Sequence, residues 1–427
     1  MMKIDFDKKD KKLRFIFDVQ LPAALASQHR EYLLFADSLG ASADFEIFYT
    51  DDKNIGGLIV GFDGFIEFLK KMLPERDASF YHEMLERIRD EHCSGLGDGL
   101  KVNFHQRSFD TPERYWSFIF EQGNFARYFI NRIGWYLCPK YTVVTPFPIH
   151  VDIESSSACN MSCPMCYRDM LREVGHMDIG VFKKIVDECA EHKIFSVRLS
   201  WRGETLTNPN IKEMIAYATK KIPNVSFLTN AFYLTEDMAD CFINNKVSYI
   251  AVSFDGIKKT YESIRYPARF EENYKRLLSL VASRRGRKAV LPQVRLCTIW
   301  PAIRDDPGDY YQTMKDVSDY IVCNPYINFK GPMDIKPEFI CQYPWERIVV
   351  AFNGKAQCCT GWNADDIVLG NVADSSIYDM WHSGLMERIR KVHADGKRMS
   401  LASCAVCRHG SKGDPNVRIK DILERKY

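Results

Sequence analysis

The chain of 427 residues is long enough for two or three domains, and its 46% hydrophobic and 27% charged residues are an ordinary globular composition. A formal net charge of +2 offers no broad basic field, which argues against a nucleic-acid partner. The charged amino terminus and the lack of any run of about 18 apolar residues argue against a signal peptide and a membrane span. We therefore expect a cytoplasmic protein whose 14 cysteines are reduced, and in which clustered thiols favour metal binding or catalysis over disulfides.

Residues 1–146 are predicted to form a separate α+β domain. The expected strands are 12–18 and 45–49, and the expected helices are 64–73, 81–89 and an aromatic-rich stretch at 113–137. Prolines at 139, 146 and 148 mark the junction with the next part of the chain. We find no catalytic motif in this region, so we expect it to have a structural role or to recognise the substrate or a partner.

Residues 147–332 alternate between strand-like and helix-like segments. Strands are expected at 149–154, 195–201, 225–229, 247–254, 293–299 and 320–329, and helices at 178–192, from 210, from 235 and at 271–284. This alternation predicts parallel strands joined by helical crossovers, in an open sheet or a partial barrel. In both architectures the active site lies at the carboxyl ends of the strands.

Three cysteines follow the first of these strands in a C-x3-C-x2-C pattern, at Cys159, Cys163 and Cys166. A tetrahedral zinc ion or a [4Fe–4S] cluster takes four cysteine ligands, so three thiolates leave one metal position open. The spacing favours an iron–sulfur cluster. A zinc ion with a distant fourth ligand, or thiols that are simply buried, are the alternatives.

Residues 333–427 carry a second cysteine set and are predicted to form a small separate domain. Its members are Cys341, the adjacent Cys358 and Cys359, and the C-x2-C pair Cys404 and Cys407. Between them, residues 348–354 predict a strand that ends in a glycine turn, and residues 374–381 predict the capped start of a helix.

With this order of motifs, the chain resembles the radical S-adenosylmethionine (SAM) enzymes, whose cluster motif is the pattern at Cys159, Cys163 and Cys166. The resemblance covers roughly residues 147–410. It implies a partial (βα)6 TIM-like barrel in which the three thiolates hold a [4Fe–4S] cluster and the open iron binds SAM. In the family, an electron from this cluster cleaves SAM into methionine and a 5'-deoxyadenosyl radical, which abstracts hydrogen from the substrate.

A second match to the family follows the second strand. Residues 201–205, Trp-Arg-Gly-Glu-Thr, resemble the family's Gly-Gly-Glu-Pro segment, which binds the amino group of SAM. Gly203 and Glu204 fit this segment, whereas Arg202 and Thr205 depart from it. The resemblance implies that the Glu204 carboxylate accepts hydrogen bonds from the SAM ammonium group.

Further candidate SAM contacts lie at later strand ends. Asn230 closes the third strand, and Ser253 and Asp255 close the fourth, where the resemblance implies contacts with the methionyl or ribose groups. Met165 stands where the family often has an aromatic residue near adenine. We expect Tyr167, just after the third cysteine, to compensate for this departure.

The second cysteine set resembles the auxiliary-cluster extension of the superfamily, called SPASM or, in its shortened form, twitch. The resemblance implies an auxiliary [4Fe–4S] cluster held by Cys341, Cys359, Cys404 and Cys407. Cys358 competes with Cys359 as the ligand. A structural zinc site with four cysteines would also satisfy this pattern.

An auxiliary cluster suggests an oxidation, because it is a suitable acceptor for the second electron. We expect an oxidoreductase that acts on a small sugar or cyclitol-like alcohol and receives electrons from a flavodoxin- or ferredoxin-type donor. One alternative is a maturase of a ribosomally made peptide. Another is a radical epimerase in which Cys297 or Cys323 donates a hydrogen atom; each is otherwise a buried small hydrophobe. A non-enzymatic zinc scaffold is the remaining alternative.

Overall fold

The structure is a computed structural model that describes two compact units. The described residues are 2–7, 12–17, 45–49, 55–61, 107–111, 142–329, 339–361, 365–410 and 417–423, with single positions at 114, 117, 118, 121, 131, 132, 134, 135, 138, 139 and 337. The first unit comprises residues 1–99 and 111–130, and the second comprises residues 100–110 and 131–427. The predicted helices at 64–73 and 81–89, and most of the stretch at 113–137, lie outside the described residues. The division at 146 and 332 stays a prediction.

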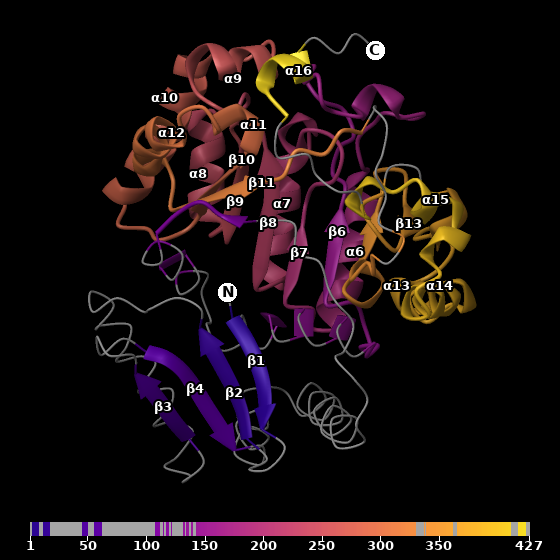
Figure 1. The fold of residues 1–427 in the computed structure, drawn as a ribbon. Coiled ribbons are helices and arrows are strands. Elements are labelled where there is room, and N and C mark those ends of the chain that lie inside the picture. The colour runs from indigo at the N-terminus through magenta and orange to yellow at the C-terminus, as the bar shows by residue number, and fades with distance from the viewer. Residues whose placement is uncertain are drawn as a thin grey trace. The chain divides into compact units, whose positions relative to one another are not determined.

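The first unit contains an antiparallel sheet of four described strands in the order β1-β2-β4-β3 (Figure 1). They are β1 (Met2–Asp7), β2 (Lys12–Phe17), β3 (Phe45–Tyr49) and β4 (Ile55–Gly61). The strands predicted at 12–18 and 45–49 are confirmed as β2 and β3. Strand β4 was not predicted, because it contains three glycines, which weaken the strand pattern.

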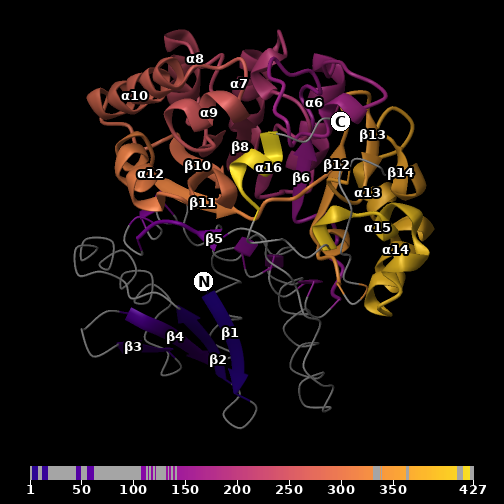
Figure 2. The same cartoon turned by 45° about the horizontal axis from the view of Figure 1, so that its top comes forward.

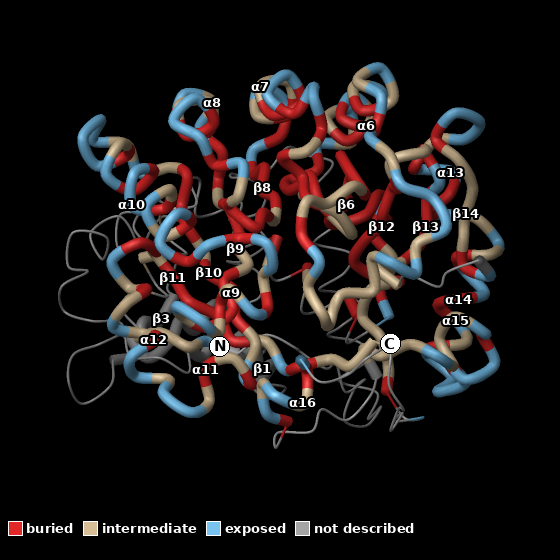
Figure 3. The backbone as a smooth tube through the Cα atoms, turned by 90° about the horizontal axis from the view of Figure 1, so that it is seen from above, coloured by how far each residue is buried: buried red, intermediate tan, exposed pale blue. Residues whose placement is uncertain are grey.

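The second unit is built on a sheet of ten described strands, whose centre is the parallel run β6-β7-β8-β9-β10-β11. These six are β6 (His150–Ile153), β7 (Ser196–Arg198), β8 (Asn224–Thr229), β9 (Tyr249–Ser253), β10 (Gln293–Ile299) and β11 (Tyr320–Asn324). They stand in chain order, as the six predicted strand–helix units require. Viewed from above they follow an open curve, which confirms the partial (βα)6 barrel (Figure 3).

Four further strands extend this sheet at its two ends. Strand β12 (Arg347–Val350) pairs in parallel with β6, and β13 (Lys355–Gln357) and β14 (Val368–Asn371) follow it in antiparallel fashion. At the other end, the short β5 (Arg107–Ser108) runs antiparallel to β11. The predicted strand and glycine turn at 348–354 are confirmed, since Gly354 has a φ of +82° between β12 and β13.

Helices cover the outer side of the curved sheet (Figure 3). The predicted helices are confirmed as α6 (Ile179–Glu191), α7 (Ile211–Lys221), α8 (Glu236–Asn244) and α10 (Phe270–Gly286). The hydroxyl of Thr235 caps α8 by accepting a hydrogen bond from the Met238 amide, as predicted. The structure adds α9 (Lys258–Ile264), α11 (Trp300–Ile303) and α12 (Pro307–Met314), which are too short for a clear periodic signal.

The region after β12 carries its own small helices at the β14 end of the sheet (Figure 2). They are α13 (Ile377–Trp381), α14 (Gly384–Ala394) and α15 (Ala402–Ala405). The helix predicted to start within 374–381 is α13, and its cap is Ser376. The last described element is α16 (Ile419–Leu423).

The two faces of the parallel sheet differ in chemistry. On β6, Val151 and Ile153 belong to the buried core, whereas the alternate residues His150 and Asp152 are polar and lie on the other face. The polar groups at this inner face pair with one another. The pairs are His150–Asp152, Arg198–Asp152, Arg347–Asp152 and Arg347–Glu346. The concave side of the sheet therefore offers polar groups to anything bound there.

Candidate functional site

The three cysteines of the first set lie on the loop that follows β6, at the carboxyl end of the strand as predicted. Cys159, Cys163 and Cys166 are each partly exposed. Backbone hydrogen bonds hold the loop: the Cys166 amide donates to the Cys163 carbonyl at 3.0 Å, and the Ser162 amide donates to the Tyr266 carbonyl at 2.9 Å. The thiols are thus presented by a loop that is fixed to its surroundings.

The Gly203-Glu204 segment packs directly against this loop. The Glu204 amide donates to the Ala158 carbonyl at 2.8 Å. A Cβ atom at position 203 would lie 2.5 Å from the carbonyl oxygens of Ala158 and Ser156, a distance that real Cβ atoms do not show. Glycine is therefore required at 203 for the two segments to approach.

The Glu204 carboxylate is buried, with a relative exposure of 2%. It accepts hydrogen bonds from the Thr229 hydroxyl at 2.7 Å and from the amides of Asn230 and Leu206 at 2.7 and 3.2 Å. Within the described part of the chain it forms no ion pair. Burial raises the pKa of Glu204 to about 7, although these donors and Arg265 lower it. A buried carboxylate without a cation fits a ligand ammonium group.

Asn230 links the third strand end to the first cysteine. Its Nδ2 lies 3.9 Å from the Cys159 Sγ and donates to the Asn160 side chain at 2.9 Å. Its side-chain oxygen accepts a hydrogen bond from the Phe232 amide at 2.9 Å. The structure thus brings Asn230 and Glu204 to the cysteine loop, as the sequence predicts for SAM contacts.

Sequence reasoning did not single out Arg265, which lies in the turn after α9. Its Nη1 is 3.8 Å from the Cys163 Sγ, and its Nε donates to the Asp255 carboxylate at 2.7 Å. The other Asp255 oxygen accepts from the Ile299 amide at 2.9 Å. Burial raises the pKa of Cys163 to about 11, and the Arg265 guanidinium opposes this rise. Asp255 therefore orients Arg265 beside the cysteine loop, and its predicted contact with SAM stays a prediction.

The two candidate hydrogen-atom donors lie on opposite faces of the sheet. Cys297 pairs in register with Ser253 on β9 and with Val322 on β11, whereas Cys323 pairs with Thr298. Since Cys323 is in register with the neighbour of Cys297, the two side chains point to opposite sides. Cys323 belongs to the helix-packed core, and Cys297 lies on the inner face with Ser253.

The structure places Tyr167 near the second cysteine set. Its ring packs edge-on against Phe329 with centroids 4.9 Å apart, and it lines the cavity that Cys341 and Cys359 also line. Burial and the neighbouring Cys166 raise the pKa of the Tyr167 phenol. Tyr167 thus stands between the two cysteine sets, and its predicted role near adenine stays a prediction.

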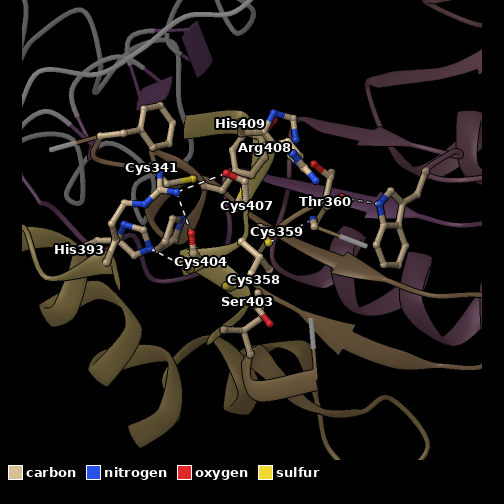
Figure 4. A pocket seen from close by; sticks show the side chains of 18 of the residues that line it. Cys341, Cys358, Cys359, Thr360, His393, Ser403, Cys404, Cys407, Arg408 and His409 are labelled. Atoms are coloured by element: carbon tan, nitrogen blue, oxygen red, sulfur yellow. Dashed lines mark hydrogen bonds between the residues drawn. The ribbon is translucent and has the colours of Figure 1, made fainter. Parts of the chain in front are cut away.

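The second cysteine set surrounds one cavity of about 250 Å³ (Figure 4). The cysteines that line it are Cys341, Cys358, Cys359, Cys404 and Cys407. Arg198, Ser200 and Leu228, from the region of β7 and β8, line it too, so the cavity continues onto the inner face of the sheet. Burial raises the pKa of Cys341 well above its usual range, and the nearby thiols of Cys359, Cys407 and Cys404 raise it further. The structure therefore brings the four candidate auxiliary ligands together.

Cys358 and Cys359 differ in their surroundings. The Gly361 amide donates to the Cys359 Sγ at 3.2 Å, as backbone amides do to ligand sulfurs. Cys358 is buried in the hydrophobic core, with 2% exposure. The Cys358 thiol and burial raise the pKa of Cys359 well above its usual range, so a metal at Cys359 must displace that proton. These contacts favour Cys359 as the ligand.

Buried cationic and neutral donors surround this cavity. Arg398, with 1% exposure, donates to the carbonyls of Cys404 and Cys407 at 2.7 and 3.4 Å. In the residues that the structure describes, Arg398 forms no ion pair. A cluster with four thiolate ligands is an anion and would supply the missing negative charge. Burial and Arg398 lower the pKa of the neighbouring His393 to about 4.

Arg202, which departs from the Gly-Gly-Glu-Pro segment of the family, has a structural role. Its guanidinium binds the Glu154 carboxylate, with Nε donating at 2.7 Å, and stacks over the Trp201 ring at 3.8 Å. Glu154 also accepts from the Phe352 amide at 3.1 Å, and the Trp201 indole donates to the Thr360 carbonyl at 3.0 Å. The segment that carries Glu204 is thereby tied to the segment that carries Cys359.

No set of three His, Cys, Asp or Glu side chains in the described residues is arranged as a metal-binding group. We propose the individual ligands from the cysteine pattern and from the contacts of each thiol.

Family comparisons agree with the two cysteine sets. Residues 153–330 match the radical SAM superfamily, and residues 341–408 match the SPASM iron–sulfur cluster-binding domain. The chain therefore carries a radical SAM domain followed by a SPASM-type domain. These domains imply SAM, a [4Fe–4S] cluster and an auxiliary cluster as cofactors. No helix in the described part of the chain is long and apolar enough to cross a membrane.

The curated relatives carry names of different functions. The chain is 28% identical over 135 residues to the antilisterial bacteriocin subtilosin biosynthesis protein AlbA of Bacillus subtilis, a match that spans 30% of each chain. It is 22% identical over 272 residues to the S-adenosyl-L-methionine-dependent 2-deoxy-scyllo-inosamine dehydrogenase of Niallia circulans, covering 61% of this chain and 93% of the relative. Among solved structures, SuiB of Streptococcus suis bound to SAM matches with 14% identity and a TM-score of 0.48, covering 90% of this chain and 99% of SuiB.

Proposed function

We propose that this chain is a radical SAM oxidoreductase that oxidises a small sugar or cyclitol-like alcohol, with the auxiliary cluster as electron acceptor. The observation that carries the proposal is the cavity lined by Cys341, Cys359, Cys404 and Cys407, with Tyr167 from the first cysteine loop on its wall. Since Tyr167 directly follows Cys166 in the chain, the proposed auxiliary cluster would lie near the first cluster, which suits a reaction in which a second electron must leave the substrate.

The roles of the first-site residues follow from their contacts. When bound, SAM and the first cluster supply a carbon-centred oxidant able to remove a hydrogen atom. Cys159, Cys163 and Cys166 would hold the cluster, and Glu204 would hold the SAM ammonium group in its buried acceptor site. Asn230 would position Cys159 through its side-chain amide, and Ser253 lies on the inner face of the sheet.

The polar inner face supports a hydroxyl-rich substrate. Arg198 and Ser200 line the cavity from the region of β7, and Ser253 ends β9, two strands along the sheet, on the same face. Buried polar groups favour ligands that hydrogen-bond to them and reject analogues that do not. The match to the Niallia circulans dehydrogenase covers 93% of that protein. The cyclitol-type substrate in its name belongs to this chemical class.

Cys297 favours a second reaction outcome at the same site, namely epimerisation. It lies on the inner face in register with Ser253, where a thiol hydrogen would be accessible to a substrate radical. If the enzyme is an epimerase, Cys297→Ala should stop turnover but preserve exchange of substrate hydrogen into 5'-deoxyadenosine. A normal product yield from this variant would remove the epimerase alternative, with Cys323→Ala as the control in the outer core.

A peptide substrate is the other alternative. Two of the curated relatives are named as a bacteriocin biosynthesis protein and a mycofactocin maturase, with the matches covering 30% and 35% of those proteins. Strands β1 and β3 are the outer strands of the four-stranded sheet in the first unit. Outer strands of this kind can pair with an extended peptide.

The two substrate classes are separated by one experiment. Anaerobically reconstituted protein, with SAM and a flavodoxin- or ferredoxin-type donor, is incubated with a panel of polyols, sugars and cyclitols, and with precursor peptides encoded beside the gene. We expect one polyol to stimulate formation of 5'-deoxyadenosine and to yield a ketone in a ratio of about one to one. Stimulation by a peptide alone, or an epimer in place of a ketone, would contradict the proposal.

A further inference from the structure

His393 contacts a proposed auxiliary ligand but belongs to no motif of the sequence. It lies near the end of α14, is 2% exposed, and lines the cavity with Cys404 and Cys407 (Figure 4). Its Nε2 is 3.5 Å from the Cys404 Sγ, within hydrogen-bond distance for a sulfur acceptor. This contact brings an imidazole to the cluster site from a helix that carries no cysteine.

The direction of this hydrogen bond follows from the chemistry of a ligand thiolate. A thiolate has no proton and can only accept, so the Nε2 of His393 must carry the hydrogen. The Nδ1 of the ring is buried and has no hydrogen-bond partner in the described residues. A neutral ring with its hydrogen on Nε2 satisfies the thiolate and leaves the lone pair at Nδ1.

The surroundings keep this geometry in place. Arg398 holds the backbone of the C-x2-C pair through the Cys404 and Cys407 carbonyls. His393 itself is fixed by its place on α14, whose Met386, Ile389 and Arg390 are also buried. The sulfur and the ring therefore belong to two packed elements, and the contact does not depend on a mobile side chain.

We propose that His393 is a positioning residue whose Nε2–H donates to the Cys404 thiolate and raises the reduction potential of the auxiliary cluster. The proposal rests on the proposed function, because it takes Cys404 as a ligand of the electron-accepting cluster. Reduction adds one electron to the cluster and makes its sulfurs more negative, so a hydrogen-bond donor stabilises the reduced state more than the oxidised state. No proton is transferred, since the hydrogen stays on Nε2.

The test isolates the auxiliary cluster from the first one. In a background with Cys159, Cys163 and Cys166 replaced by Ala, the remaining iron–sulfur signal is titrated against potential and followed by electron paramagnetic resonance. His393→Phe and His393→Met remove the donor, His393→Gln retains an N–H donor, and His192→Phe serves as the control. His192 stacks on Phe147 and Tyr378 and does not line the cavity.

We expect the midpoint potential to fall in His393→Phe and in His393→Met, to return toward the parent value in His393→Gln, and to stay unchanged in His192→Phe. An unchanged potential in both donor-free variants, with full iron content, would overturn the role of His393 alone. Loss of iron from all three His393 variants would overturn it too, because His393 would then be a ligand. A parent that binds zinc in place of iron would overturn the proposed function together with this inference.

Discussion

At the scale of single residues, Glu204 shows how burial prepares a group for its ligand. It accepts three hydrogen bonds and is nearly inaccessible to water, yet it forms no ion pair in the described residues. Its raised pKa means that part of the free protein holds a proton on Glu204 near neutral pH. The proton must leave Glu204 before its carboxylate can bind a cationic ligand.

The affinity for SAM should therefore depend on pH in a defined direction. Below the pKa of Glu204 of about 7, affinity should fall as pH falls, at most about tenfold per unit, because protonated Glu204 loses its charge. Glu204→Gln should weaken SAM binding about 10- to 100-fold and flatten this dependence. Anaerobic calorimetry between pH 6 and 8.5 measures both. Equal pH profiles for the two proteins would show that Glu204 does not bind the ammonium group.

The adjacent cysteines give a second test at this scale. Cys359→Ala should remove an auxiliary ligand and lower the iron content by about half, from about eight atoms to about four per chain. The Cys358→Ala variant should keep the full iron content, since the Cys358 side chain packs in the hydrophobic core. Iron and zinc analysis of the anaerobically purified variants decides between them. The reverse pattern would assign the ligand to Cys358.

At the scale of elements, the cysteine loop depends on its close contact with the segment after β7. The Gly203 Cα lies so near the Ala158 and Ser156 carbonyls that no side chain fits. Because the clashing atoms belong to the backbone, relief requires the loop itself to move. The same segment is tied through Arg202 and Trp201 to the neighbourhood of Cys359.

Gly203→Ala should therefore displace the loop and abolish the first cluster while the auxiliary cluster remains. The expected result is a loss of about half the iron and of SAM cleavage. Gly286→Ala at the end of α10 is the matched control, since a Cβ there meets nothing within 4 Å. Full iron content in Gly203→Ala would show that the contact is not required.

Many of these elements could be predicted from the sequence because their signals are local. The β-branched run of β9 and the Thr235 cap of α8 are examples, and the structure confirms them. The contacts of Arg265 and His393 with Cys163 and Cys404 could not be predicted, because they join segments that no spacing rule connects. For the same reason, the sequence places Tyr167 next to Cys166 but does not show that it also lines the auxiliary cavity.

At the scale of the whole second unit, one strand pairing relates the two cysteine sets. Strand β12, which follows Cys341, pairs in parallel with β6, which precedes Cys159. The pairing joins segments almost 200 residues apart, Arg347 with His150, and so brings the SPASM region against the barrel. The polar inner face of the sheet is then continuous with the auxiliary cavity. Substrate bound on that face would lie near both redox sites.

We propose that the auxiliary cluster held by the second cysteine set accepts the electron that leaves the substrate. The most direct measurement quantifies 5'-deoxyadenosine and oxidised product in parallel, under anaerobic turnover, for the wild-type protein and for Cys404→Ala/Cys407→Ala. The account predicts that the double variant retains about half the iron and still cleaves SAM, but forms little or no ketone. A double variant that forms ketone at the wild-type ratio to 5'-deoxyadenosine would contradict it.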